Sequence, residues 1–355
     1  MIPSEFYQYI FLILVTLMTV VVAQNKRSVY DEEPFGYSLI VCILCILFIG
    51  TRPHTAVFGD TINYVNWWGL KIWLGFDPSC ENLLFDNLYN WMGSIFPTPS
   101  LFFVLIASIY FGCILIAARK LFPANTLIVF LVYLAAFSTF SYSTNGIKAG
   151  AASTLFLVSL AYRDKLPISI IFLLLSWGFH HSMQMPVAAY VITLFFKDSK
   201  WYFYGWLFCL LMAMGHVTFF QNLFAGMSDE SGNGYLTSDS GGDWGGKSGF
   251  RIDFVIYSAM PVLMGYYVLF KYKLQDKLYE IMLHQYLVTN GIWMLCMYAG
   301  FTNRIAYLSW CLYPFLVVWP CFAIPNESHP LVENRLKYIF AHLGFTLFME
   351  LIYYA

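Results

Sequence analysis

Apolar runs long enough to cross a lipid bilayer recur along almost the whole sequence, and no other feature restricts the fold so strongly. A bilayer core about 30 Å thick requires about 20 mainly apolar residues in a helical span. Closed β-barrels would instead show short segments of alternating polarity, whereas these runs are continuous and rich in Leu, Ile, Phe and Val. Only 11% of the 355 residues are charged, compared with about 25% in an average soluble domain. The sequence therefore predicts an all-α, polytopic integral membrane protein.

About twelve transmembrane helices are predicted, and together they form a single transmembrane domain over residues 1–355. The runs lie at 6–23, 36–51, 100–118, 124–141, 146–162, 166–181, 184–196, 201–220, 252–270, 278–299, 303–323 and 336–354. The short runs 166–181 and 184–196 are joined through Pro186, so they form either two spans or one broken or re-entrant pair. The first run lacks a basic segment and a small-residue cleavage site, which favours a retained span over a signal peptide.

Positively charged residues indicate the orientation, because Lys and Arg accumulate in short cytoplasmic loops. With the N-terminus outside, 13 of the 19 Lys and Arg residues fall in inward connections. These are Lys26, Arg27, Arg119, Lys120, Arg163, Lys165, Lys197, Lys200, Lys271, Lys273, Lys277, Arg335 and Lys337. The six others are Arg52, Lys71, Lys148, Lys247, Arg251 and Arg304. Both termini then face outward.

Composition excludes several classes of protein. The net charge of −1 supplies no basic surface for nucleic acid. Seven of the eight cysteines lie inside apolar runs, where a thiol is usually a small packing residue, so no disulfide framework is expected. No HExxH, GxSxG, P-loop or GxGxxG motif appears in a strand–helix context, which argues against zinc proteases, serine hydrolases and nucleotide-driven pumps.

Two long outer loops are predicted. Residues 52–99 include "NYVNWWGLKIWLG", whose crowded aromatic and apolar residues favour an interfacial helix. Trp67, Trp68 and Trp73 could stack on sugars or rest on lipid headgroups. Residues 222–250 form a Gly- and Ser-rich flexible loop. The acidic residues of that loop are Asp229, Glu230, Asp239 and Asp243. They could bind a divalent cation weakly, but we expect a solvated loop and no required metal or cofactor.

Basic and imidazole groups collect at the outer ends of the predicted spans. They are Arg52, Lys148, His180, His181, Arg251 and Arg304. Such a cluster is costly at the membrane surface unless an anion compensates it. A pyrophosphate-linked lipid fits, because Arg offers phosphate a planar fork and Lys a point charge. Arg304 is the strongest candidate, since Gly300 and Asn303 suggest a close helix start.

Each of these residues also has a purely structural alternative. Arg and Lys at span ends often extend to water, and Arg251 could pair with Asp253. Asp60 follows a glycine and could serve only to cap the interfacial helix. His180 and His181 point to different faces of a helix, so we expect at most one of them to face a shared cavity, and we prefer His180. The structural alternative is that a histidine here is a hydrogen-bonded packing residue.

Three segments resemble, in order, the conserved blocks of the EpsG-like members of the Wzy-type polysaccharide polymerases. "GTRPHTAVFGDTINY" (50–64) is similar to the family's R…GtD…nY segment after the second span. "NGIKAGAASTLFLVSLAYRDKLPISIIFLLLSWGFHHSMQMPV" (145–187) resembles its N-x-x-R-x-G helix start and the later H-x-S, and "FTNRIAYLSWCLYPFL" (301–316) resembles its late N-R-[IV] segment. Matched by position, the resemblance implies roles for Arg52, Asp60, Tyr64, Asn145, Gly150, His180 and Arg304. Lys148 stands where the family usually has arginine, so the bidentate grip on phosphate is lost there.

The resemblance implies a metal-independent glycosyltransferase in the bacterial inner (cytoplasmic) membrane that acts on its periplasmic or outer side. Its donor and acceptor would be polyprenyl-pyrophosphate-linked oligosaccharides, with membrane lipid around it. A chain-length regulator and a flippase are the protein partners that fit such a role. In the implied mechanism His180 or Asp60 takes the acceptor proton, while Arg304, Arg251, Arg52 and Lys148 neutralise the leaving pyrophosphate.

Two other classes of function remain open at this stage. One is a different membrane transferase, such as an O-acyltransferase or a lipid-linked glycan ligase. The other is a flippase or transporter for the same lipid. Transporters carry charges and broken helices near the bilayer midplane, whereas the deep parts of these spans are nearly free of charge.

Overall fold

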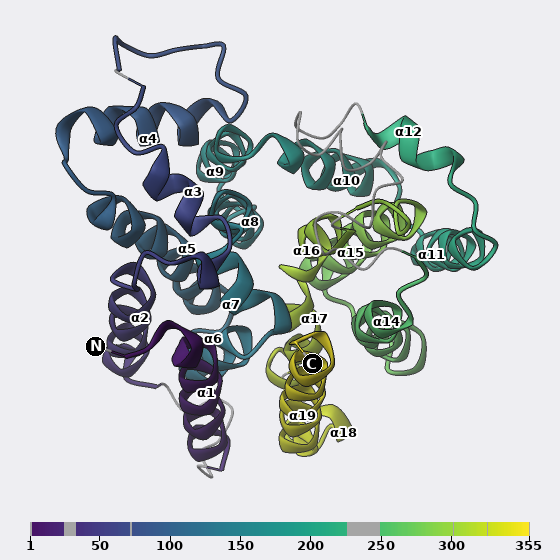
Figure 1. Cartoon of the computed structure of the whole chain (residues 1–355). Coiled ribbons are helices and arrows are strands. Elements are labelled where there is room, and N and C mark those ends of the chain that lie inside the picture. Colours follow the sequence, from purple (N-terminus) through teal and green to yellow (C-terminus); the bar gives the residue numbers. More distant parts are fainter. Residues whose placement is uncertain are drawn as a thin grey trace. The chain divides into compact units, whose positions relative to one another are not determined.

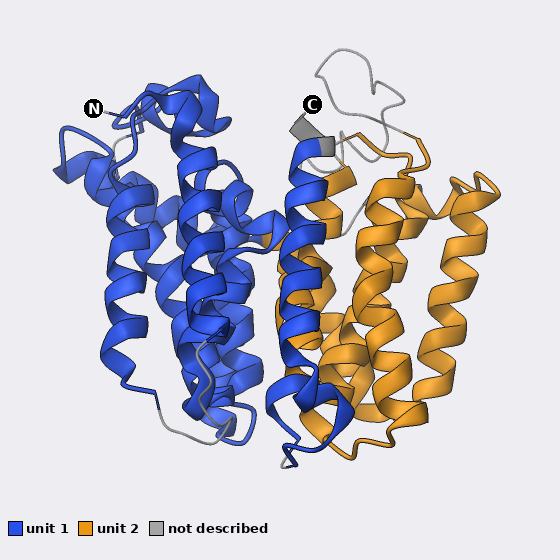
Figure 2. Cartoon of the chain, turned by 90° about the horizontal axis from the view of Figure 1, so that it is seen from below, with its two compact units in different colours: residues 1–180, 321–355 blue, residues 181–320 orange. Residues whose placement is uncertain are grey.

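The computed structural model describes residues 2–24, 33–71, 73–225, 249–300, 302–324 and 326–354. Within these ranges the regular structure is helical and contains no strand, which confirms the predicted all-α class. Two compact units divide the chain, one formed by 1–180 with 321–355 and the other by 181–320 (Figure 2). The single transmembrane domain therefore stays a prediction. Most of the predicted loop 222–250 lies outside the described residues, as do Lys26, Arg27, Asp229, Glu230, Asp239, Asp243 and Lys247.

The helices follow the apolar runs closely (Figure 1). Unit 1 contains η1 (Ser4–Phe6), α1 (Tyr7–Ala23), α2 (Phe35–Gly50), η2 (Ala56–Phe58), α3 (Thr61–Asn66), α4 (Leu83–Ile95), α5 (Ser100–Leu121), η3 (Pro123–Asn125), α6 (Thr126–Leu134), α7 (Phe137–Thr144), α8 (Ile147–Ala161), α9 (Leu166–Phe179), α18 (Pro330–Glu333) and α19 (Arg335–Tyr354). Unit 2 contains η4 (His181–Met183), α10 (Gln184–Phe195), α11 (Ser199–Met214), α12 (Phe219–Ala225), α14 (Ile252–Tyr266), η5 (Tyr267–Lys271), α15 (Lys277–Leu295) and α16 (Thr302–Trp310). Helix α17 (Tyr313–Phe322) runs across the boundary between the units.

Several helices are suited to a membrane by length and composition. Among the described residues, four are long and apolar enough to cross it: Ser4–Ala23, Ser100–Leu121, Ile252–Lys271 and Thr302–Phe322. Shorter apolar helices at Phe35–Gly50, Ile147–Ala161 and Leu166–Phe179 coincide with further predicted spans. Large apolar side chains such as Val21, Leu44 and Leu174 are exposed on these helices, as expected for contact with lipid. The protein is therefore membrane-embedded, and the total of about twelve spans stays a prediction.

The predicted span 124–141 is not a straight helix, because α6 and α7 meet there at a bend of 75° and form a broken span or a re-entrant loop. Neither proline nor glycine stands at the break; Ala136 is extended there, with ψ of 142°. The carbonyl oxygen of Tyr133 accepts the backbone N–H of Ala136 at 3.0 Å and the Thr139 hydroxyl at 2.7 Å. A hydroxyl side chain of α7 therefore adds a hydrogen bond across the break.

The tryptophan-rich stretch after α3 is not the helix that its composition predicts, since α3 ends at Asn66. Gly69 and Gly75 have φ angles of +72° and +129°, which break a helix. The indole of Trp68 instead donates a 2.8 Å hydrogen bond to the carbonyl oxygen of Phe96, so the stretch folds back along α4. Position in the membrane interface stays a prediction for this segment.

The start of α1 and the end of α19 lie at the same end of unit 1. The ring of Tyr7 stacks on Phe48 near the end of α2, with centroids 4.7 Å apart, and meets the edge of Phe58 at 5.4 Å. The Gln8 amide donates a 2.7 Å hydrogen bond to the carboxyl of Glu350 near the end of α19. This geometry agrees with the sequence scheme, in which both termini face the same side of the membrane.

Unit 2 is built around α11 and α15, which run parallel. Ser199 Oγ lies 2.8 Å from His284 Nε2 near the two helix starts, and His216 stacks on Tyr298 beyond the two helix ends. The scheme likewise has these two spans crossing in the same direction.

A buried polar network ties the centre of unit 2 together. The Asn290 amide donates 3.0 Å hydrogen bonds to Ser258 Oγ and Ser309 Oγ and accepts one of 2.8 Å from Trp206. Trp310 donates to the same Ser258 hydroxyl at 2.8 Å. Four helices therefore share one satisfied and uncharged network, which fixes their relative rotation.

Helix α8 packs so closely on α7 that Gly150 leaves no room for a side chain. A Cβ at Gly150 would lie 2.4 Å from the backbone oxygen of Tyr142, whereas a Cβ at Gly112 in α5 would meet nothing within 4 Å. We expect Gly150→Ala to lower the free energy of unfolding by about 1–3 kcal/mol, because backbone must move. Gly112→Ala is the matched control and should be neutral or stabilising by about 0.5–1 kcal/mol. Thermal melting of the purified protein measures both; equal melting temperatures would contradict the close packing.

Candidate functional site

A buried arginine joins the end of α2 to two other segments of unit 1. The Arg52 side chain is 2% exposed. Its guanidinium donates to the carbonyl oxygen of Ile49 at 2.9 Å, to the hydroxyl of Thr61 at 2.7 Å and to the carbonyl oxygen of Thr144 at 3.1 Å. Thr61 also donates to the Thr144 carbonyl at 2.8 Å. Arg52 thus has its hydrogen bonds inside the protein, which fits a positioning role better than direct contact with a phosphate.

The two sequence blocks 50–64 and 145–150 meet directly next to this arginine. The backbone N–H of Asp60 donates a 2.8 Å hydrogen bond to the side-chain oxygen of Asn145. Gly59 has φ of +55°, and a Cβ there would lie 2.3 Å from that same oxygen. Glycine is therefore required by both the backbone conformation and the close approach. The structure brings Arg52, Asp60 and Asn145 together although 85 residues separate the last two.

Asp60 stands at the N-cap position of α3, but its carboxylate makes no capping hydrogen bond. The capping alternative for Asp60 is therefore wrong. The side chain is partly exposed, and the fixed backbone N–H holds it at the surface of this end of unit 1.

Phe85 of α4 is the hub around which several candidate residues gather. Its buried ring lies 5.9 Å from the ring of Tyr64 and 6.1 Å from that of Phe179, measured between centroids. The ammonium of Lys148 lies 5.7 Å from the same ring. Gly178 of α9 packs on Leu84 so tightly that a Cβ would come within 2.5 Å of its side chain. Elements α3, α4, α8 and the end of α9 therefore share one end of unit 1 (Figure 1).

Lys148 is paired with an acid that the sequence did not single out. Its ammonium lies 3.9 Å from Asp86 Oδ1, and the side chains are 29% exposed for the lysine and 30% exposed for the aspartate. The other carboxylate oxygen of Asp86 accepts a 3.0 Å hydrogen bond from the backbone of Asn82 at the start of α4. The separation of 3.9 Å is long for a salt bridge, so an anion entering from solvent could compete with Asp86 for the ammonium.

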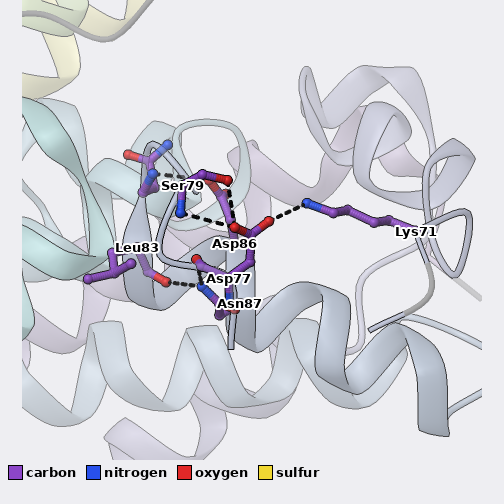
Figure 3. Close-up of polar contacts among 7 residues, drawn as sticks. Lys71, Asp77, Ser79, Leu83, Asp86 and Asn87 are labelled. Atoms are coloured by element: carbon purple, nitrogen blue, oxygen red, sulfur yellow. Dashed lines mark hydrogen bonds and ion pairs between the residues drawn. The ribbon is translucent and has the colours of Figure 1, made fainter. Parts of the chain in front are cut away.

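Polar contacts order the loop that leads into α4 (Figure 3). Asn87 accepts a 2.7 Å hydrogen bond from the backbone of Asp77 and donates one of 2.8 Å to its carbonyl oxygen. Lys71 forms a 3.0 Å ion pair with the Asp77 carboxylate, and Ser79 donates to the other oxygen. The hydrogen bonds from Ser79 and Lys71 hold the pKa of the Asp77 carboxyl below its usual range. These contacts fix α4, and with it Phe85, next to α3, the start of α8 and the end of α9.

The two adjacent histidines belong to different units. Helix α9 ends at Phe179, two residues before the predicted span end, and His180 follows with an extended backbone. His180 is partly exposed next to Phe179, which places it near the Phe85 hub. His181 belongs to unit 2, where its Nε2 lies 3.0 Å from the side-chain nitrogen of Gln184.

Unit 2 holds the two remaining candidate arginines. Arg251 is 8% exposed, and two of its nitrogens contact the two carboxylate oxygens of Asp253, one of them at 2.9 Å. Its guanidinium also lies 3.7 Å from the ring centroid of Phe254. The predicted pairing of Arg251 with Asp253 is therefore confirmed. Arg304 differs, because its side chain is exposed in the first turn of α16.

The electrostatics of this end of unit 1 separate structural groups from accessible ones. Burial lowers the pKa of Arg52 to about 10, which still leaves the guanidinium protonated at neutral pH. Burial and then the charge of Arg52 lower the pKa of His54, whose ring packs on Phe103 at 5.1 Å, so its imidazole is neutral. Among the described residues, no group of three or more His, Cys, Asp and Glu is arranged to hold a metal ion. The accessible groups are thus Lys148, Asp60 and His180.

Sequence reasoning missed the residues that hold this arrangement. Phe85 and Asp86 lie in "LLFDNLYN", whose amphipathic pattern predicts a helix but gives no sign that it packs over α8 and α9. Thr61 and Thr144 are ordinary helix-end residues in the sequence. Only the tertiary contacts identify them as partners of Arg52.

Replacing Arg52 by lysine keeps the charge and tests the hydrogen bonds. A lysine ammonium cannot reach the three acceptors in a fork, and each lost bond to a charged donor costs about 1.5–3 kcal/mol. We expect Arg52→Lys to lower the free energy of unfolding by about 3 kcal/mol in denaturant titrations. The control is Arg119→Lys, whose solvent-exposed 2.6 Å bond to Pro123 should matter by less than about 0.5 kcal/mol. An Arg52→Lys protein as stable as its control would contradict the clamp.

Comparison with known proteins covers both units. The EpsG family matches residues 35–354, a range that contains every candidate residue. No curated protein and no solved structure matches the chain significantly. The match extends over far more than half of the sequence, and it agrees with the membrane-embedded helical fold and with the order of the three sequence blocks. The chain therefore belongs to the EpsG family.

Proposed function

We propose that this protein is a polysaccharide polymerase, a glycosyltransferase that moves a growing glycan from polyprenyl pyrophosphate to a lipid-linked repeat unit. The family supports polysaccharide polymerisation in general, and the donor, the acceptor and the periplasmic or outer location are our inference. The observation that carries the proposal is the close assembly of the 50–64 and 145–150 blocks. It places Asp60 and Lys148 at the end of unit 1 where α9 delivers His180.

The reaction needs one base and several cations. The acceptor hydroxyl oxygen attacks the anomeric carbon, the bond from that carbon to the pyrophosphate oxygen breaks, and the pyrophosphate leaves with the electron pair. His180, or alternatively Asp60, takes the hydroxyl proton. Lys148 is an accessible cation of unit 1 that would neutralise the leaving group. Arg304, an exposed cation of unit 2, is a candidate for the same role.

The other candidate residues act through their neighbours in this proposal. Arg52 positions the 59–61 turn through Thr61, and Asn145 holds the Asp60 backbone. Arg251 is engaged by Asp253 and would support the start of α14. Tyr64 lines the hub through its contact with Phe85, and His181, whose ring lies next to Gln184, stays a candidate residue of unit 2.

Polymer length in cells tests the proposed site. Arg304→Ala and His180→Ala should leave short or single repeat units where the parent makes long chains. Loss of a general base such as His180 typically lowers the rate by about 10²–10⁴-fold, and loss of Arg304 removes a cation that stabilises the leaving pyrophosphate. Lys200→Ala, an exposed lysine at the predicted inward end of α11, is the control and should give parental lengths. Chains of normal length in both variants, at normal membrane levels, would overturn the site. Polymer that keeps its length but loses acyl groups would favour an O-acyltransferase instead.

Exchanging the charges of Lys148 and Asp86 separates a structural pair from a phosphate ligand. Each single reversal, Lys148→Asp or Asp86→Lys, puts two like charges together and should lower the amount of protein in the membrane. The double exchange restores the pairing and should restore the protein level. Polymer should stay short, since the cation no longer stands on α8. Recovery of long polymer in the double variant would show that Lys148 serves only to pair with Asp86.

A further inference from the structure

Helix α11 ends on a histidine in the left-handed conformation. Among the described residues outside glycine, His216 with φ of 56° and Lys273 with φ of 55° have positive φ angles. The N–H of His216 donates to the carbonyl oxygen of Ala213 at 3.1 Å and that of Val217 to Met212 at 3.0 Å. This is the helix ending in which glycine is strongly preferred at the left-handed position. Histidine at a position that favours glycine points to a use for its side chain.

The imidazole of His216 is held in place on a tyrosine ring. Its ring stacks on that of Tyr298 with centroids 3.9 Å apart and planes inclined by 13°. The Tyr298 hydroxyl donates a 2.9 Å hydrogen bond to the carbonyl oxygen of Ala213, which anchors the tyrosine to α11. His216 is itself exposed. One face of the imidazole thus rests on a fixed ring, in a residue that is exposed.

This stacked pair lies at the end of unit 2 that carries both candidate arginines. The Arg251 backbone N–H donates to Met297 Sδ at 3.2 Å, and Met297 is the chain neighbour of Tyr298. The side chain of Ile305, next to Arg304, packs against Cys296 and Ala299. The turn 296–299 therefore connects the stacked pair to the starts of α14 and α16.

We propose that His216 and Tyr298 form a saccharide-binding platform, which we call the 216/298 platform, for a neutral sugar of the glycan. A pyranose ring has an apolar C–H face and polar hydroxyls at its edge. The flat face of the imidazole can stack on the C–H face of the sugar. The ring nitrogens donate and accept hydrogen bonds and can bind the hydroxyls. The nearby Arg304 suits the phosphate end of a lipid-linked substrate. The assignment of that sugar to a polymerase substrate rests on the proposed function, whereas sugar binding at the platform does not.

Glycine substitution removes the imidazole without straining the backbone, because glycine adopts a φ of +56° readily. His216→Gly and the matched control Lys273→Gly therefore change the same kind of backbone position, and only the first removes platform chemistry. Tyr298→Phe keeps the stacked ring and loses the anchoring hydroxyl. The probe is a set of oligosaccharides obtained by mild acid hydrolysis of the polymer that the parent strain makes, and binding to the full-length protein in detergent is followed by saturation-transfer NMR.

We expect His216→Gly to weaken oligosaccharide binding at least tenfold, with a melting temperature equal to or above that of the parent. Lys273→Gly should bind like the parent, and Tyr298→Phe should lose less affinity than His216→Gly. Parental affinity in His216→Gly, or no binding by the parent protein at millimolar oligosaccharide, would overturn the platform. Polymer production in a strain lacking the gene distinguishes the two proposals. Normal polymer there would refute the polymerase assignment and leave a positive binding result for the platform intact.

Discussion

The buried guanidinium of Arg52 is the constraint on which the rest of unit 1 depends. It fastens the end of α2 to Thr61 at the start of α3 and to the carbonyl oxygen of Thr144 at the end of α7. Burying a charge to this extent is costly without hydrogen bonds, and both terminal nitrogens of the guanidinium donate to protein oxygens. The loop after α2 is therefore held in one conformation, and the Gly59–Asp60 turn is pressed against Asn145.

The candidate polar groups of the two units fall into two kinds. Arg52 and Arg251 are buried and have close internal partners, so each maintains local geometry. Lys148, Asp60, His180 and Arg304 are at least partly exposed at helix ends. Phe85 links the unit 1 members of the second kind, because α3, α8 and α9 all pack on its ring. An apolar hub thus organises residues whose chemistry is polar.

Hydropathy alone predicted the helical class and most helix positions, because a membrane requires long apolar segments whatever their tertiary partners. It failed at Ala135 and Ala136, where the bend depends on Thr139 bonding to a carbonyl oxygen across the break. Composition also predicted too long a helix after α3. Gly69 has a positive φ, and the indole of Trp68 donates to the carbonyl oxygen of Phe96 just after α4; no local sequence pattern encodes this contact. Of the candidate site, sequence supplied the charged residues and the motif order. The partners that decide their roles, Phe85, Asp86 and Thr144, are set by packing between distant segments.

The central claim is that the charged helix ends serve glycan transfer from a lipid pyrophosphate. The most direct measurement uses the purified full-length protein in liposomes with a polyprenyl-pyrophosphate-linked repeat unit as the sole substrate. The account predicts longer lipid-linked glycans, with one polyprenyl pyrophosphate released for each new linkage. Unchanged substrate in the presence of folded protein, or glycan growth without release of the lipid pyrophosphate, would contradict it.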